Sequence, residues 1–102
     1  MKKKMKFNTK AIHGGQILDP AYGSVMTPIY QTSTYAQTSP GKHKGYEYTR
    51  SHNPTRTRLE ECLASLENAK HCFVTASGLS ASALIMHMLP KGSKIICGDD
   101  VY

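Results

Sequence analysis

The chain has 102 residues, which allows one small domain at most. Hydrophobic residues make up 39% and charged residues 20%, a globular composition that excludes an intrinsically disordered chain. No apolar run reaches the roughly 18 residues that a membrane-spanning helix needs, so we expect no membrane partner.

The chain is basic, with a net charge of +6, and the positive charge is concentrated in two places. One cluster lies in the first ten residues and comprises Lys2, Lys3, Lys4, Lys6 and Lys10. It lacks arginine and a following apolar segment, so it fits neither a signal peptide nor a transit peptide. We expect a solvated, frayed amino terminus, with electrostatic attraction to nucleic acid or membrane as the alternative. The second cluster lies within residues 42–58.

Cysteine usage indicates a reducing compartment. Cys62, Cys72 and Cys97 form no CxxC pair and leave an odd thiol, which argues against a disulfide framework and against a zinc site. The histidines show no metal-ligand spacing either. We therefore expect a cytoplasmic protein without a metal.

Residues 1–53 show no sustained hydrophobic period and are rich in Gly, Pro, Ser, Thr and Tyr. Prolines and glycines interrupt this half at intervals too short for long elements. A long irregular segment is ordered only on a larger surface, either the rest of its own chain or another subunit. We predict an extended N-terminal arm with little regular structure that contacts a neighbouring subunit.

A helix is predicted over about residues 54–68. Asn53 is a favourable N-cap, and Pro54 suits the first helical position. Apolar residues then recur at helical spacing, namely Leu59, Cys62, Leu63 and Leu66. We expect Cys62 to lie in the core on this apolar face.

Residues 54–102 are predicted to begin an α/β domain. The apolar run 71–76 suits a buried strand, 79–89 a buried helix, and 94–97 a second buried strand. Strand, helix and strand in this order predict a right-handed βαβ unit with parallel strands. Two strands do not complete a parallel sheet, so the domain is expected to be incomplete.

The turn between the first predicted strand and its helix is a candidate anion site. The backbone N–H groups of Gly78 and Leu79 are among the first donors of the helix, and the Ser77 hydroxyl lies beside them. Gly78 lets an anion approach the backbone closely. The alternative is that Ser77 simply caps the helix.

The sequence "YEYTR" at residues 46–50 is a second candidate. Arg50 with the Tyr48 hydroxyl suits a phosphate, although an exposed loop arginine is the simpler interpretation. The mixture of basic and aromatic residues in 42–58 also fits single-stranded nucleic acid. Tyr102 follows the second predicted strand, where it would stack on a planar ring whose phosphate lies at Gly78.

Five motifs occur in order along the chain: "AIHGG", "TPIYQTSTY", "YEYTRSHNPTR", "ASGLSA" and "IICGDDVY". Together they resemble the amino-terminal quarter of the Cys/Met-metabolism family of pyridoxal-phosphate (PLP) enzymes, the transsulfuration enzymes. The cystathionine gamma-lyases look most similar, with cystathionine gamma-synthase and methionine gamma-lyase as alternatives. The resemblance implies PLP as cofactor and the large domain of a fold type I transferase. It also implies gamma elimination of L-cystathionine by a homotetramer, a dimer of dimers that shares active sites between subunits.

The resemblance implies roles for individual residues. Tyr48 and Arg50 would bind the cofactor phosphate of the neighbouring subunit, while Ser77, Gly78 and Leu79 would bind the phosphate of their own.

Three further expectations concern the rest of the active site. Tyr102 would stack on the pyridine ring, and Glu47 and Tyr48 would lie near the neighbour's substrate. The family's Schiff-base lysine is expected beyond residue 102, so no catalytic residue is predicted in this segment and the chain alone should be inactive. The alternative is a truncated, non-catalytic assembly partner; no nucleic-acid partner is expected.

Overall fold

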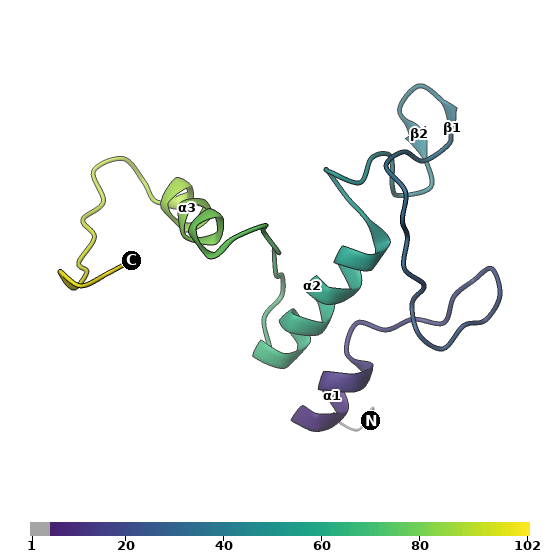
Figure 1. Cartoon of the computed structure of the whole chain (residues 1–102), viewed down its shortest axis with the longest axis horizontal. Helices are drawn as coiled ribbons and strands as arrows, with labels where there is room; N and C mark the ends of the chain where they lie inside the picture. Colours follow the sequence, from purple (N-terminus) through teal and green to yellow (C-terminus); the bar gives the residue numbers. More distant parts are fainter. Residues whose placement is uncertain (1–4) are drawn as a thin grey trace.

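The computed structural model describes residues 5–102, and its elements follow one another along an open chain (Figure 1). In order they are α1 (Phe7–His13), β1 (Gln37–Ser39), β2 (Lys42–His43), α2 (Pro54–Glu67) and α3 (Gly78–Met88). The radius of gyration is 17.7 Å, whereas a compact domain of this length has about 13 Å. The described chain is therefore not closed around one core, and α2 is the element that the other segments approach.

Helix α2 confirms the prediction for residues 54–68 almost to the residue. Its N-cap is Asn53, whose side-chain Oδ1 accepts a hydrogen bond from Thr55 N at 2.8 Å. The helix ends at Asn68, which adopts the left-handed conformation (φ 53°) that commonly closes helices. Local signals were sufficient here because both ends carry their own capping residue.

Helix α1 packs against α2 and was not predicted. Lys10 Nζ donates to Ser65 O and to Asn68 Oδ1, both at 2.6 Å. A cation at the last carbonyls of a helix offsets the negative end of its dipole, so this lysine joins the two helices. The expected fraying is therefore wrong for Lys10, whereas Lys2, Lys3 and Lys4 lie outside the described residues.

The prediction that Cys62 lies in the core is only partly confirmed. Its side chain is half-buried, with Sγ 3.7 Å from Lys10 O at the contact between α1 and α2. On the same predicted apolar face, Leu59 remains 48% exposed. Within the described chain, α1 covers one part of the apolar stripe and leaves the rest open.

A short antiparallel hairpin adds further unpredicted regular structure to residues 1–53. Strands β1 and β2 turn through Gly41, whose φ of 76° suits glycine. Backbone pairing continues in the segments that flank β1 and β2: Tyr35 N donates to Glu47 O at 3.0 Å, and Thr34 forms an antiparallel bridge with Tyr48. The hairpin thereby fixes the segment that carries Glu47 and Tyr48. Among the described residues of this half, regular structure is limited to α1, β1 and β2.

Helix α3 confirms the helix predicted over 79–89, but its surroundings differ from those predicted. The segments 71–76 and 94–97 form no strand, and the sheet of the described residues consists of β1 and β2 alone. A strand exists only where a neighbour accepts and donates its ladder hydrogen bonds, and no such neighbour is present. The predicted βαβ unit is therefore not formed.

The predicted burial of α3 is also wrong. Its apolar side chains are exposed, with Leu79 at 70% and Met88 at 83%, because no sheet covers it. No helix in the part of the chain described by the structure is long and apolar enough to cross a membrane.

Candidate functional site

The amino-terminal end of α3 forms an open hollow of about 640 Å³. It is lined by Ser77, Gly78, Leu79, Ser82 and Tyr102. The structure therefore brings the predicted turn and the predicted ring-stacking tyrosine to one place. Tyr102 is fully exposed at this hollow, so its ring is accessible to a ligand.

The donors in this hollow suit an anion. In the described chain no hydrogen bond occupies the N–H groups of Gly78 and Leu79, which point along the positive end of the helix dipole. A Cβ built on Gly78 would meet no atom within 4 Å, so open space lies directly at the backbone. The geometry fits a phosphate that approaches the first turn of α3.

Ser77 also fulfils the alternative role that the sequence left open. Its Oγ accepts from Ser80 N at 3.1 Å and lies 2.9 Å from Ser80 Oγ, so the residue caps α3. Capping and anion binding are compatible here, because the cap uses the serine side chain and leaves the backbone donors of Gly78 and Leu79 to a ligand.

Tyr48 and Arg50 form a second cluster at the base of the hairpin. Arg50 Nη2 lies 3.4 Å from Tyr48 Oη, and its Cζ is 5.5 Å from the centre of the tyrosine ring. Both side chains are exposed. The pair thus presents a guanidinium and a hydroxyl outward at one point, while Glu47 is an exposed residue whose backbone carbonyl is paired with Tyr35.

The two clusters do not meet in one pocket of this chain. The hollow at α3 is lined only by residues from 77 onward, and neither Tyr48 nor Arg50 contributes to it. In Figure 1 the hairpin and α3 lie toward opposite sides of α2.

Asn53 holds the loop of Tyr48 and Arg50 in place, a role that capping signals alone did not indicate. The residue is only 6% exposed. Its Nδ2 donates to Tyr30 O at 3.1 Å and to Thr49 Oγ1 at 3.2 Å, while Oδ1 caps α2. One side chain therefore connects the hairpin base, the preceding segment and the helix.

We expect Asn53→Ala to lower the free energy of unfolding by about 2 kcal/mol, since it removes a cap and leaves two half-buried partners, Tyr30 O and Thr49 Oγ1, unpaired. Asn53→Asp should lose less, because it keeps the capping acceptor. Denaturant unfolding of both variants checks this, with the exposed Asn8→Ala as control. Equal stability of Asn53→Ala and Asn8→Ala would contradict the assigned role.

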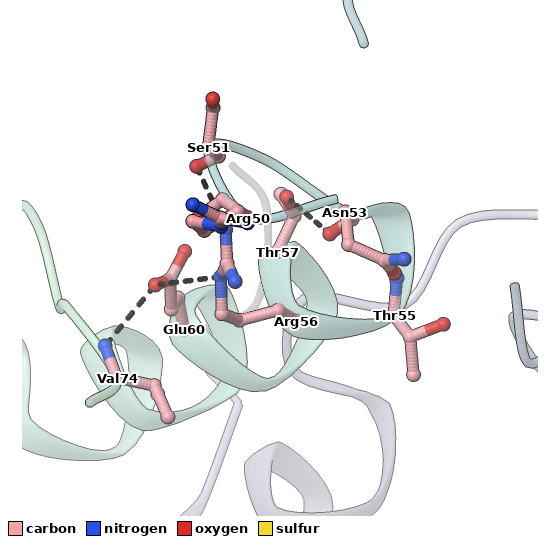
Figure 2. Close-up of polar contacts among 8 residues, drawn as sticks. All are labelled: Arg50, Ser51, Asn53, Thr55, Arg56, Thr57, Glu60 and Val74. Atoms are coloured by element: carbon pink, nitrogen blue, oxygen red, sulfur yellow. Dashed lines mark hydrogen bonds and ion pairs between the residues drawn. The ribbon is translucent and has the colours of Figure 1, made fainter. Parts of the chain in front are cut away.

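Arg56 and Glu60, in the first turns of α2, contact Ser51 beside Arg50 and Val74 ahead of Ser77, and the sequence analysis did not single them out (Figure 2). Arg56 Nη2 donates to Ser51 O at 2.7 Å, and its Nε lies 3.9 Å from Glu60 Oε1. The same carboxylate oxygen accepts from Val74 N at 3.1 Å. The i, i+4 spacing of Arg56 and Glu60 is visible in the sequence, whereas the contacts to Ser51 and Val74 are not.

The start of α3 with its two free backbone donors and the exposed pair of Arg50 and Tyr48 both suit a phosphate-bearing ligand. The chain belongs to the Cys/Met metabolism PLP-dependent enzyme family, whose sequence profile matches residues 8–102. The family is enzymatic, and its description names pyridoxal phosphate as the cofactor.

Relatives with three different names resemble the chain. It is 60% identical over 96 residues to a probable cystathionine gamma-synthase of Herpetosiphon aurantiacus, covering 94% of this chain and 30% of that protein. It is 54% identical over 100 residues to a cystathionine beta-lyase of Coxiella burnetii, covering 98% and 26%. It is 50% identical over 99 residues to the human cystathionine gamma-lyase, covering 94% and 24%. The chain thus spans less than a third of these relatives.

Solved structures agree with this assignment. The crystal structure of metB from Corynebacterium glutamicum matches with a TM-score of 0.80 and 43% identity, over 85% of this chain and 23% of that one. Cystathionine gamma-lyase from yeast matches with a TM-score of 0.79 and 45% identity, over 91% and 24%. The arrangement of the described elements is therefore that of this family's enzymes.

Proposed function

We propose that this chain is the amino-terminal part of a PLP-dependent transsulfuration enzyme that cleaves L-cystathionine by gamma elimination. The observation that carries the proposal is the hollow at the start of α3, where two unpaired backbone N–H groups and Tyr102 meet. The chain spans 24% to 30% of the relatives reported above, so the activity belongs to the complete gene product.

Each candidate residue has a defined task in this proposal. Ser77, Gly78 and Leu79 bind the cofactor phosphate at the positive end of α3, and Tyr102 covers the planar ring. When bound, PLP supplies the electron sink that makes the substrate's carbon–hydrogen bonds acidic.

The loop cluster acts on a second subunit. Tyr48 and Arg50 are exposed and remain outside the hollow of their own chain, which supports the proposal that they bind the phosphate of a neighbour's cofactor. Glu47 and Tyr48 would then lie near that neighbour's substrate. This requires a homo-oligomer, proposed as a tetramer built from two dimers in the cytoplasm.

The remaining part of the domain explains the exposed apolar segments. We propose that segments 71–76 and 94–97 pair as strands once the rest of the fold type I sheet is present, and that this sheet covers α3. In this scheme residues 1–53 form the arm and residues 54–102 begin the PLP-binding domain.

Assays of the complete gene product test the function. With PLP bound, it should release a thiol from L-cystathionine, namely cysteine, together with 2-oxobutanoate and ammonia, identified by mass spectrometry; homocysteine with pyruvate would indicate a beta-lyase. Release from L-methionine instead would indicate a methionine gamma-lyase, and thiol consumption in the synthetic direction would indicate a synthase. A PLP-loaded protein that acts on none of these sulfur amino acids would contradict the proposal.

The 102-residue chain alone should lack the Schiff-base lysine. After incubation with PLP and borohydride, we expect no single lysine to be labelled above the others, because none lies at the hollow of α3. Peptide mapping by mass spectrometry measures this, with the complete gene product as positive control. One specifically labelled lysine in residues 1–102 would show that the chain carries its own catalytic group.

The second candidate function is a non-catalytic assembly partner, supported by the exposed apolar surface of α3 and of the segment that follows it. Under this alternative the 102-residue chain should co-elute with a full-length homologue in gel filtration. Separate elution of the two proteins would contradict this alternative.

A further inference from the structure

We propose that Arg56 and Glu60 are positioning residues that set both phosphate-binding elements of the chain from one face of α2. Arg56 fixes the loop of Arg50, Glu60 fixes the segment that leads into Ser77, and the contact between them keeps the two in register. The inference rests on the proposed function, since it assigns a role in cofactor binding to residues that do not touch the cofactor.

The loop end of this connection consists of backbone contacts. Arg56 Nη2 donates to Ser51 O at 2.7 Å and reaches Arg50 O at 3.5 Å (Figure 2). The Arg56 side chain is 30% exposed, so these contacts are partly shielded from water. A guanidinium bound to carbonyls directly at and after Arg50 restricts the backbone that aims the Arg50 side chain.

The turn end depends on one carboxylate oxygen. Glu60 Oε1 accepts from Val74 N at 3.1 Å, and the glutamate side chain is only 16% exposed. Among the described residues, no other hydrogen bond ties 71–76 to α2. Val74 lies three residues before Ser77, so this contact sets where the chain enters the anion-binding turn.

The link between the two ends is the pair Arg56 and Glu60 itself. They are four residues apart on α2, with Nε 3.9 Å from Oε1. An ion pair at this distance contributes little alone. The hydrogen bonds to Ser51 and Val74 therefore carry the effect, and the pair places both donors and acceptors on the same face of α2.

The test measures PLP affinity in the complete gene product by titrating the apoprotein. We expect Arg56→Ala and Glu60→Ala each to weaken PLP binding about tenfold, the size expected when a hydrogen bond to a charged group is lost. Glu60→Gln should recover most of this loss, because its amide oxygen can still accept from Val74 N. The matched control is Glu67→Ala, which removes an exposed glutamate of the same helix whose side chain forms no hydrogen bond or ion pair in the described chain; this variant should bind PLP like the wild type.

A double variant separates positioning from mere stability. If Arg56 acts through Arg50, then adding Arg56→Ala to Arg50→Ala should weaken PLP binding no further than Arg50→Ala does. Losses that multiply, or affinities that stay at the wild-type value in Arg56→Ala and Glu60→Ala, would overturn the inference. A Glu60→Gln variant no better than Glu60→Ala would also overturn it.

Failure of the proposed function gives a different result. In that case the wild-type protein binds no PLP, and amide hydrogen exchange decides the inference about the contacts themselves. Faster exchange across 71–76 in Glu60→Ala, but not in Glu67→Ala, supports the positioning role. Unchanged exchange overturns it.

Discussion

Replacing Arg50 by alanine is expected to weaken PLP binding of the complete gene product about 100-fold. A phosphate held by a guanidinium loses one or two charge-assisted hydrogen bonds, each worth about 1.5–3 kcal/mol, and 1.4 kcal/mol corresponds to a tenfold change in affinity. The Arg50 side chain is exposed and lies over the Tyr48 ring, so the melting temperature of the apoprotein should stay near the wild-type value. Absorbance titration of the apoprotein with PLP measures the affinity.

The control for this prediction removes the same charge nearby. Lys42 on β2 is exposed, and Lys42→Ala should leave PLP affinity within about twofold of the wild type, because a screened surface charge acts weakly at a distance. If Lys42→Ala and Arg50→Ala weakened binding equally, the basic stretch would attract PLP only through its general charge. Arg50→Lys should be intermediate, since an ammonium keeps the charge but loses the planar donor pair.

Capping residues in the sequence predicted the two helices whose ends depend on neighbouring residues. Asn53 and Pro54 start α2, and Ser77 caps α3, because the capping bonds form within three residues of the cap. These helices could be located from the sequence to within about a residue. Their surroundings could not, since burial of α3 depends on a sheet that the described residues do not contain.

Tertiary contacts account for the elements that the sequence analysis missed. Helix α1 has seven residues, too few for a stable isolated helix, and is held by Lys10 at the end of α2. From the sequence alone, a lysine-rich terminus is expected to be solvated, because the acceptors at Ser65 and Asn68 are distant along the chain. The partner of each such contact lies more than 50 residues away.

The residues of the candidate site also differ in how far the sequence pointed to them. Tyr48, Arg50 and Ser77 could be proposed as phosphate ligands from residue types and from the family resemblance, because their chemistry is visible in short motifs. Arg56 and Glu60 were not singled out, since an arginine and a glutamate on a helix usually form an exposed pair. Only the folded position of Val74 shows that this glutamate also accepts a hydrogen bond from a backbone N–H three residues before Ser77.

Gly15→Ala is expected to lower the free energy of unfolding by about 3 kcal/mol, more than the other substitutions proposed above. Gly15 has φ of 71°, which costs an alanine about 1 kcal/mol. The new Cβ would also lie 2.7 Å from Cys62 N and 2.9 Å from Arg58 O, both backbone atoms of α2 that cannot rotate away. Overpacking of this kind adds about 1–3 kcal/mol, and α1 would have to move off α2.

Gly23→Ala is the matched control, because Gly23 has nearly the same φ, 72°, and no atom within 4 Å of its added Cβ. It should cost only the backbone strain, about 1 kcal/mol. Denaturant unfolding of the complete gene product compares the two variants. Faster labelling of Cys62 by a thiol reagent in Gly15→Ala, resolved by peptide mapping, would report that α1 has detached, since Cys62 Sγ lies against the Lys10 carbonyl. Equal costs for both variants, with unchanged Cys62 labelling, would mean that the contact between α1 and α2 does not need a glycine at this position.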